Sequence, residues 1–442
     1  MQYSARLRTN LRSLLLLIIA LISVFFLFSC DGDDEVIRTK EEILTLVTGE
    51  TDKDETYVTT YLDRWDIPVF NEMKMRGVEI VYRDHYVEDL PDAFTLAKKT
   101  AELFLEHFYD EIDLTSKTDV TDSLIYCYVE TIGDDYSAYR TEKDYNAHTT
   151  DMSGTFYGIG VTVQYNAIEN TITVISVSQG SGAEDAGIRT GDVIIKADGK
   201  TVEELGYTNF INAIRGELGT RVAVTVMRGD EEKTFDVERK KVVEESVKYS
   251  INDDKIAYII ITDFKANTSE QFKSAVDRAK SDGAKGIIYD LRSNPGGYLS
   301  AVVDMLSYIA PTGTKLVSFT NDYAEPQYST NIHTVTLPTV VICNEYTASA
   351  GELFTAAIRD FGDAEMFKST IVGKNTFGKG IMQNTYEFTD GSAVTMTVAY
   401  YNPPCGVNYH NVGIVPDVDV ELGEEGDAQL DAAYAEIDKL IN

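Results

Sequence analysis

Histidine and cysteine are scarce in this chain, and neither occurs in a spacing that predicts a metal site or a histidine-based catalytic centre. The 442 residues include five histidines and four cysteines. No His-Glu-x-x-His or Cys-x-x-Cys sequence is present, so we expect no metal and no cofactor. None of the histidines lies in the glycine–serine or acidic motifs that surround a Ser-His-Asp triad; they are His85, His107, His148, His333 and His410. A hydrolase built from this chain would need a different base.

Positive charge is also scarce. There are 39 lysines and arginines against 72 aspartates and glutamates, which gives a formal net charge of −33. This balance argues against nucleic acid as a partner and against a basic membrane-binding face. We interpret the acidic residues as a solvated surface. The hydrophobic content of 43% is that of a globular protein with sizeable cores.

A long apolar run occurs only at the N-terminus. Leu14 to Phe28 is apolar apart from Ser23, and three arginines precede it. At ~1.5 Å per residue this run would cover about 22 Å, which is short of the ~30 Å hydrocarbon core. It therefore predicts a signal peptide over residues 1–29. The following Leu27-Phe-Ser-Cys30 resembles a bacterial lipoprotein signal, which implies that Cys30 is lipidated and anchors the mature chain to a membrane.

An acidic segment follows Cys30, and we interpret residues 30–65 as a tether. Its first part, Asp31-Gly-Asp-Asp-Glu35, resembles the surface-export signal of some Gram-negative lipoproteins. We therefore expect a lipoprotein of the bacterial cell envelope, in the outer membrane, that faces either the periplasm or the cell surface. Three cysteines remain after Cys30. Cys343 lies in an apolar run, which predicts a buried structural thiol.

Residues 66–152 are expected to form an N-terminal helical region. Phe94, Ala97, Ala101 and Phe104 recur at helical spacing and predict one apolar face, to which Leu105 also belongs. The stretch Ile132 to Tyr139 predicts a turn that enters a further helix.

Residues 153–243 predict a compact β-rich module. The expected strands are Ile159–Gln164, Ile172–Ser176, Asp192–Ala197 and Ala223–Arg228, and the expected short helices are Ala183–Ala186 and Tyr207–Glu217. Two glycines open the first strand, in the segment Tyr157, Gly158, Ile159, Gly160 and Val161. Such a segment can present successive backbone N–H groups to a peptide carboxylate. Together with Ser181–Ile188 and Thr190–Ile194, this pattern resembles a PDZ domain, and the resemblance implies capture of a C-terminal tail.

Residues 244–442 predict an α/β core with a partly parallel sheet. Three continuous apolar runs predict buried strands: Ile256–Ile261, Gly286–Asp290 and Thr339–Cys343. The expected helices are Ser269–Lys280, Tyr298–Tyr308, Ala350–Phe361 and the closing Asp427–Ile441, with a further strand over Ser392–Tyr400. The predicted fold class is therefore a multidomain α+β and α/β protein.

A candidate nucleophile lies in this core. Ser349 stands among small residues after a predicted buried strand, and the N–H of Ala350 would lie beside it at a helix N-terminus. The strand that ends at Asp290 leads into a glycine-ended turn at Gly296 and Gly297, whose N–H groups can point at a developing oxyanion. Charge-assisted bonds between Asp290 and Arg292 could hold this loop.

Lys379 is the candidate general base. A lysine acts as a base only when neutral, so its pKa must fall from a reference value of ~10.4 to ~7–8. Burial against Phe377, between two flanking glycines, could achieve this. The neutral amide of Gln383 could orient the ammonium. Lys374 is the rival base, although nothing comparable confines it.

Four ordered motifs resemble the carboxy-terminal processing peptidases, also called tail-specific proteases. They are Gly133–Ser137, Asp290–Gly297, Thr347–Glu352 and Thr376–Gln383. The resemblance implies that Ser349 is the nucleophile of a Ser–Lys dyad and Lys379 its base, with Gln383 positioning the lysine. It also implies an oxyanion hole at Gly296, Gly297 and Ala350, and supporting roles for Glu352 and Asp360. The chain departs from the family pattern at Gly351 and Cys405.

The resemblance implies a serine endopeptidase that cleaves proteins near free C-terminal tails. Its partners would be protein or peptide substrates and the membrane, and a homo-oligomer is left open. Two alternatives remain: a catalytically inactive peptide-binding scaffold of the envelope, and a retained fold that binds a different, hydrophobic ligand. The intact trio Ser349, Lys379 and Gln383 favours the enzyme.

Overall fold

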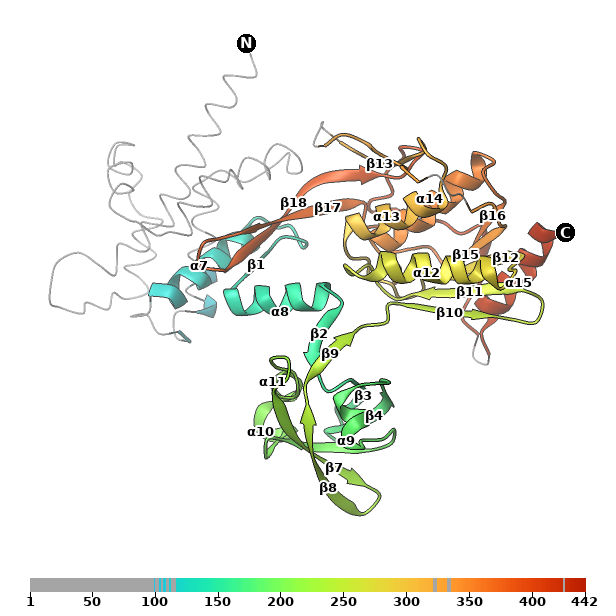
Figure 1. Cartoon of the computed structure of the whole chain (residues 1–442). Helices are drawn as coiled ribbons and strands as arrows, with labels where there is room; N and C mark the ends of the chain where they lie inside the picture. The colour runs from blue at the N-terminus through green and yellow to red at the C-terminus, as the bar shows by residue number, and fades with distance from the viewer. Residues whose placement is uncertain are drawn as a thin grey trace, which may run out of the picture. The chain divides into compact units, whose positions relative to one another are not determined.

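The computed structural model describes residues 99, 103, 104, 106–108, 111, 112, 117–320, 324–331, 335–423 and 426–442 (Figure 1). The predicted signal segment, Cys30, the acidic tether and most of the predicted N-terminal helical face lie outside these residues. No helix in the described part is long and apolar enough to cross a membrane. The chain forms two compact units. Unit 1 comprises Met1–Ala147, Pro311–Ile332 and Phe377–Ile414, and unit 2 comprises His148–Ala310, His333–Thr376 and Val415–Asn442.

Unit 2 contains a six-stranded sheet in the order β10-β11-β12-β15-β16-β19. The first pair is antiparallel, and the other four pairs are parallel. Every residue of β12 and β15 is buried, as expected of strands covered on both faces. The strands are β10 (Val247–Ile251), β11 (Ile256–Ile261), β12 (Gly286–Asp290), β15 (Thr339–Cys343), β16 (Ser369–Gly373) and β19 (Val418–Asp419).

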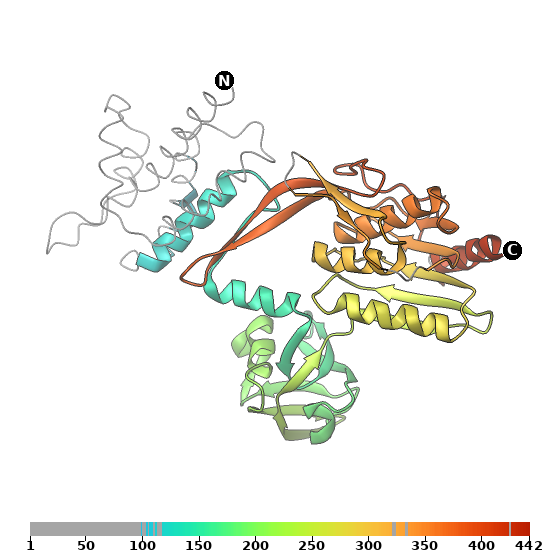
Figure 2. The same cartoon turned by 45° about the horizontal axis from the view of Figure 1, so that its top comes forward.

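Helices cover both faces of this sheet (Figures 1 and 2). On one face, Tyr289 of β12 packs with Phe272 and Phe354, which belong to α12 (Thr268–Ser281) and α14 (Ala350–Asp363). α13 (Leu299–Ile309) lies between these two helices. On the other face, Ile288 joins Ile437 of α15 (Ala428–Ile441) in one apolar cluster. Successive residues of a strand point to opposite faces, so β12 connects the two layers.

The β-rich module also belongs to unit 2. Its sheet has the order β3-β4-β5-β7-β8, with β6 paired to β5, around a core of buried isoleucine, valine and phenylalanine side chains. These elements are β3 (Val161–Asn166), β4 (Thr171–Val177), α9 (Gly182–Ala186), β5 (Val193–Ala197), β6 (Lys200–Thr201), α10 (Val202–Leu205), α11 (Tyr207–Ile214), β7 (Arg221–Arg228) and β8 (Glu231–Glu238). A separate pair, β2 (Thr155–Gly158) and β9 (Lys240–Val243), carries the chain into and out of the module.

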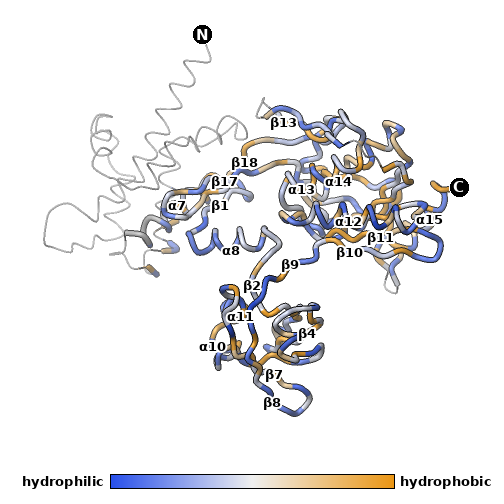
Figure 3. Tube along the Cα trace, in the orientation of Figure 1, coloured by the Kyte–Doolittle hydropathy of each residue, from blue (hydrophilic) through white to orange (hydrophobic). Residues whose placement is uncertain are grey.

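Unit 1 is built around an antiparallel sheet in the order β1-β18-β13-β14, with β17 also paired to β18. α8 (Glu142–Met152), mostly hydrophilic in Figure 3, buries none of its residues. It contains the boundary between the two units in the sequence. The remaining elements are α7 (Lys117–Thr131), β1 (Ala138–Arg140), β13 (Lys315–Phe319), β14 (Gln327–Tyr328), β17 (Ile381–Glu387) and β18 (Ala393–Asn402).

The predicted combination of a β-rich module and an α/β core with a partly parallel sheet is confirmed. Two local predictions are wrong. The helix expected to reach Glu217 ends at Ile214, because Arg215 is extended and the N–H of Gly216 donates to Tyr157 O instead. The stretch Ile132 to Tyr139, predicted as a turn that enters a further helix, does not lead directly into α8: its last two residues belong to β1, which pairs with β18 from a distant part of the chain.

Candidate active site

Ser349 occupies a strained turn between β15 and α14. Its backbone has φ 53° and ψ −116°, a conformation that L residues rarely adopt. Such a conformation costs about 1–3 kcal/mol and persists only where the surroundings hold it. The turn leaves Ser349 half-buried at the N-terminus of α14, where the helix dipole favours negative charge. The prediction that this serine immediately precedes a helix is confirmed.

The buried carboxylate of Glu352 holds this turn. Glu352 is 0% exposed, and its Oε2 accepts a 2.9 Å hydrogen bond from the N–H of Ser349. Its Oε1 accepts a 2.6 Å bond from the hydroxyl of Thr376. The first turn of α14 is a favourable place for a carboxylate, because unpaired N–H groups and the helix dipole point toward it. Glu352 therefore stabilises the strained backbone of Ser349 from below the surface.

The loop after β12 presents backbone N–H groups beside Ser349. Asn294, which is fully buried, accepts a 2.8 Å bond from the N–H of Gly296 through Oδ1 and donates to Ile261 O through Nδ2. The N–H groups of Gly297 and Ala350 donate to no acceptor within the described ranges. Two of the three predicted oxyanion donors are thus available to a ligand, and the third is occupied by Asn294.

Gly296 has a different role in the site. A Cβ built on Gly296 would lie 2.7 Å from Ser349 Cβ and 3.0 Å from Ala350 N, at a φ of +101°. Both the close approach and the positive φ require glycine. Gly296 therefore allows the loop after β12 to pack directly against the serine.

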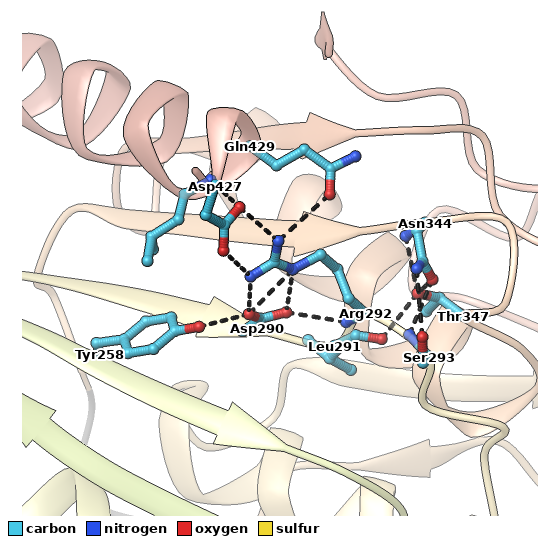
Figure 4. Close-up of polar contacts among 10 residues, drawn as sticks. Tyr258, Asp290, Leu291, Arg292, Ser293, Asn344, Thr347, Asp427 and Gln429 are labelled. Atoms are coloured by element: carbon cyan, nitrogen blue, oxygen red, sulfur yellow. Dashed lines mark hydrogen bonds and ion pairs between the residues drawn. The ribbon is translucent and has the colours of Figure 1, made fainter. Parts of the chain in front are cut away.

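Arg292 anchors the same loop to the opposite face of the sheet (Figure 4). Its guanidinium contacts Asp290 (Nη2–Oδ2 2.6 Å) and Asp427 at the N-cap of α15 (Nη1–Oδ1 2.7 Å). The hydrogen bond from Arg292 lowers the pKa of Asp427 below its usual range. The predicted contact between Asp290 and Arg292 is confirmed, and Asp427 is a partner that the sequence did not indicate.

Two further polar residues tie the loops after β12 and β15 together (Figure 4). Asn344 Oδ1 accepts a 2.8 Å bond from the N–H of Ser293, and the hydroxyl of Thr347 donates to Leu291 O at 2.8 Å. Sequence reasoning did not give either residue a role. The available signal was their position at the carboxyl end of a buried strand, where side chains reach the neighbouring strand end.

Lys379 lies in unit 1, on a turn before β17. The backbone of this turn is held by residues that follow β17. Tyr401 donates its hydroxyl to Lys379 O at 3.1 Å, and Asn411 donates its N–H to Gly378 O at 2.8 Å. Asn408 donates its side-chain amide to Gly380 O at 2.9 Å. The position of the lysine therefore depends on the segment that includes residues 401–411.

The side chain of Lys379 contacts a different aromatic residue from the one we expected. Phe377 is 57% exposed, whereas the Nζ of Lys379 lies 4.3 Å from the ring centroid of Tyr136. Burial against Phe377 is therefore a wrong prediction. Tyr136 belongs to the Gly133–Ser137 motif, so that motif supplies the ring that contacts the lysine. An aromatic face attracts an ammonium group and so confines its position.

The other two predicted participants differ in their environments. Gln383 of β17 donates its amide Nε2 to Thr397 Oγ1 at 3.0 Å, which fixes its side chain within unit 1. Lys374, the rival base, lies in unit 2 and forms ion pairs with Asp419 at 2.8 Å and Glu421 at 2.5 Å. The hydrogen bonds that Lys374 donates to these two carboxylates raise its pKa well above the ordinary value. A lysine held in its charged form is a poor base.

The candidate residues are thus distributed over both units. In unit 2 the structure brings Ser349 together with Gly296, Gly297, Ala350 and Glu352, whereas Asp360 lies farther along α14 and is half-buried. In unit 1 it places Lys379 and Gln383 at the start of β17 and its preceding turn. Each unit carries one part of the predicted machinery.

The β-rich module has two backbone N–H groups without an acceptor among the described residues where carboxylate capture was predicted. β2 ends at Gly158 and β3 begins at Val161, so Ile159 and Gly160 connect the two strands. Their carbonyls accept from Ala183 and Ser178, but their own N–H groups donate to no acceptor in the part of the chain that the structure describes. Gly160 has a φ of +78°. Two neighbouring free N–H groups are compatible with an anionic ligand.

The remaining titratable clusters add no competing centre. Among the described residues, no group of three or more histidine, cysteine, aspartate or glutamate side chains could hold a metal ion. Cys343 is fully buried, and burial raises the pKa of its thiol to about 12. The prediction that Cys343 is a buried thiol is confirmed.

Comparison with known proteins places both domains in families. Residues 255–420 match the family described as Peptidase family S41, and residues 157–238 match the family described as PDZ domain. A probable CtpA-like serine protease of Staphylococcus aureus is 36% identical over 304 residues. The corresponding protein of Staphylococcus haemolyticus is 36% identical over 296 residues. Each alignment covers 66% of this chain but 58% of the relative, so the chain spans little more than half the length of these relatives.

Solved structures of similar proteins were also found. A photosystem II D1 C-terminal processing protease aligns with 23% identity and a TM-score of 0.46, covering 83% of this chain and 96% of the other. A lipoprotein from Streptococcus agalactiae aligns with 14% identity and a TM-score of 0.45, covering 84% and 97%.

Proposed function

Because the chain belongs to peptidase family S41, we propose that it is a serine endopeptidase in which Ser349 is the nucleophile and Lys379 the general base. The observation that carries this proposal is the turn at Ser349. A serine held in a strained conformation, near N–H groups of Gly297 and Ala350 that have no acceptor among the described residues, has the arrangement that acyl transfer requires. A serine whose only role is to begin a helix does not need this strained backbone conformation.

In the proposed reaction, neutral Lys379 removes the proton from Ser349 Oγ as this oxygen attacks the peptide carbonyl. The N–H groups of Gly297 and Ala350 then donate to the oxyanion of the tetrahedral intermediate. The resulting ammonium of Lys379 gives its proton to the leaving amine. Water, activated by the same lysine, hydrolyses the acyl-enzyme and restores the serine. Gln383 positions the lysine without adding charge.

We propose that Glu352 supports this reaction indirectly. Its carboxylate accepts from the Ser349 N–H, so it holds the turn in the conformation that exposes Oγ. It also accepts from the Thr376 hydroxyl, three residues before Lys379. Asp360 belongs to the same helix and is assigned a structural role.

The PDZ domain is proposed to capture the C-terminal tail of the substrate. The free N–H groups of Ile159 and Gly160 support this role, because a terminal carboxylate can accept from two adjacent backbone donors. The exposed Tyr157 and the first residue of β3, Val161, flank these donors. Cleavage would then occur upstream of the captured tail.

We also propose that the chain is a lipoprotein of the bacterial cell envelope, anchored through Cys30. The arginine-led apolar run and the Leu27–Cys30 sequence support this proposal. Acyl-chain labelling of the wild-type chain and of Cys30→Ser tests it. Lipid on the wild type alone is expected, and an unlabelled wild type would exclude the anchor.

The dyad is tested by incubating the purified full-length protein with a denatured protein substrate. Ser349→Ala and Lys379→Ala should each lose cleavage, while Lys374→Ala serves as a matched lysine control and should retain it. Undiminished cleavage by either dyad variant would refute the assignment. If none of the proteins cleaves any substrate, the alternative of an inactive peptide-binding scaffold is favoured.

Tail capture is tested with peptides that differ only at their C-terminus. Peptides with a free carboxylate should bind more tightly than amidated copies when binding is followed by fluorescence anisotropy. Equal affinity for both would remove the capture role from Ile159 and Gly160. This measurement uses Ser349→Ala protein, so that the peptides are not cleaved.

A further inference from the structure

We propose that His410 is a positioning residue for Lys379 and that it makes the geometry of the lysine turn depend on pH. The inference rests on the proposed role of Lys379 as general base. It concerns a histidine that the sequence motifs did not connect with catalysis. All the residues involved belong to unit 1.

The backbone of the lysine turn is fixed almost completely by one segment. The carbonyls of Gly378, Lys379 and Gly380 accept from Asn411 N, the Tyr401 hydroxyl and Asn408 Nδ2, respectively. None of these three donors titrates near neutral pH. They hold the turn in the same way at every pH at which the protein is folded.

His410 provides a further contact with this turn. The N–H of Gly380 donates to His410 Nδ1 at a distance of 3.3 Å. Nδ1 can accept this bond only when it carries no proton, so the neutral ring must be protonated on Nε2. The backbone N–H of His410 donates to Asn408 Oδ1 at 2.7 Å, and its ring packs edge-on against Tyr400 at 5.5 Å between centroids. The imidazole is therefore held in one place, beside the residue that follows Lys379.

The surroundings favour the neutral imidazole. Burial lowers the pKa of His410 below its usual value, and the positive charge of Lys379 lowers it further. Asp134 and a hydrogen bond with the Gly378 backbone act in the opposite direction and are outweighed. The ring of Tyr400, on β18, also contacts the imidazole edge-on. His410 is therefore an acceptor at pH 7.

Protonation of His410 changes the turn in two ways. Nδ1 becomes a donor, so the hydrogen bond from the Gly380 N–H is lost. A second positive charge also appears near the ammonium of Lys379 and repels it. Both changes displace the base, so we expect kcat to fall about tenfold on the acid side, the effect of about one lost hydrogen bond. This decrease adds to the loss of activity that protonation of the lysine itself causes.

The test compares pH profiles of kcat and KM from pH 5 to 10 for four full-length proteins. In His410→Asn the amide oxygen replaces Nδ1 as an acceptor but does not titrate. This variant should match the wild type at pH 8 and, on the acid side, keep only the decrease that protonation of Lys379 causes, without the further decrease of about tenfold assigned to His410. His410→Phe should lose about tenfold in kcat at all pH values with little change in KM. His107→Asn, a change at an exposed histidine, should leave the whole profile unchanged. An acid-side decrease in His410→Asn as large as that of the wild type would overturn the proposal.

A second measurement does not depend on activity. In protein labelled with ¹⁵N-histidine, the His410 signals are identified by their loss in His410→Asn. At pH 7.5 they should show Nε2 protonated and Nδ1 unprotonated, and Lys379→Met should raise the pKa of His410 because a nearby positive charge is removed. A protonated Nδ1 at pH 7.5 would refute the inference even if the dyad is correct. Undiminished cleavage by Lys379→Ala would instead refute the proposed function and leave the NMR result unaffected.

Discussion

Replacing Gly296 with alanine should abolish the proposed peptidase activity by displacing Ser349, while leaving the fold intact. The added Cβ would lie 2.7 Å from Ser349 Cβ and 2.9 Å from Ala348 O. Carbon atoms in contact prefer a separation of ~3.5–4.0 Å, so the overlap is about 1 Å. Rotation of the serine side chain cannot relieve it, because Cβ does not move with χ1. The backbone at Ser349 must shift instead.

The expected magnitude has two parts. An alanine at φ +101° costs about 1–3 kcal/mol in backbone strain. Overpacking against the serine adds about 1–3 kcal/mol. This cost either lowers the free energy of unfolding or is relieved by a displacement of Ser349. A displacement of about 1 Å at a reacting group lowers the rate about 100-fold. We therefore expect kcat to fall about 100-fold or more in Gly296→Ala.

Gly283→Ala is the matched control. Gly283 also has a positive φ, +75°, but an added Cβ there meets no atom within 4 Å. This variant has comparable strain without the contact at Ser349, so it should lose about 1 kcal/mol in urea denaturation and keep wild-type kcat. Both variants are assayed for unfolding and for cleavage of a denatured substrate. If Gly296→Ala keeps the kcat of Gly283→Ala, the assignment of Gly296 as the spacer beside the nucleophile is wrong.

Three other changes have defined outcomes. Tyr289→Phe should raise the free energy of unfolding in urea by about 1 kcal/mol, because the Tyr289 hydroxyl is buried without a hydrogen-bond partner among the described residues; a loss of stability would contradict this. Lys374→Met should keep kcat within about twofold of wild type, since its ion pairs lie away from the proposed chemistry; inactivation would reopen its role as base. Arg292 lowers the pKa of Asp427, so this carboxylate stabilises the fold above its unfolded pKa of ~3.9 and the effect is lost as pH falls through the lower folded value. Arg292→Met should therefore show a smaller decrease in stability between pH 5 and pH 2 than the wild type, and an equal decrease would refute the coupling.

The core strands could be predicted from the sequence because their environment is uniform. β11, β12 and β15 begin and end at the predicted residues, since each is a continuous apolar run covered on both faces. β17 was not predicted from the sequence, because only its first residue, Ile381, is buried. A strand with a largely exposed surface has little hydrophobic pattern. Its existence depends on pairing with β18 rather than on its own composition.

The division into two units could not be read along the chain. Unit 1 joins an N-terminal segment to Pro311–Ile332 and Phe377–Ile414, and β1 pairs with β18 through contacts such as Arg140 with Thr395, 255 positions apart. No local pattern encodes pairing over that separation. Composition predicts contiguous domain boundaries. A change in composition along the chain shows where one segment ends, but not which distant segment it packs against.

Individual hydrogen bonds of the candidate site could not be predicted from the sequence for the same reason, because they join distant parts of the chain or depend on its tertiary packing. The sequence predicted Ser349 as a nucleophile because small residues and a helix start surround it. The positive φ of Ser349 and its bond to Glu352 Oε2 depend on tertiary packing. His410 was set aside for lack of a motif, and its contact with Gly380 joins two segments outside helices and strands that β17 and β18 separate in the sequence. Motifs identify residues that react, whereas residues that only position others need no fixed spacing.

The adjacent glycines of the oxyanion loop show why residue type alone does not define function. Gly296 and Gly297 are indistinguishable by sequence, and both were predicted as donors. Asn294 takes up the N–H of Gly296, which leaves Gly296 as the residue that allows contact with Ser349. The N–H of Gly297 has no acceptor within the described ranges, and a Cβ added at Gly297, whose φ is +141°, would lie 2.3 Å from the carbonyl oxygen of Phe264. Gly296 therefore allows close packing against Ser349, whereas Gly297 keeps an N–H group that can donate. The difference arises because Asn294 accepts the hydrogen bond from Gly296. Replacing Asn294 with leucine, which removes the acceptor, should free the N–H of Gly296 and loosen the loop, so kcat should fall although both glycines remain.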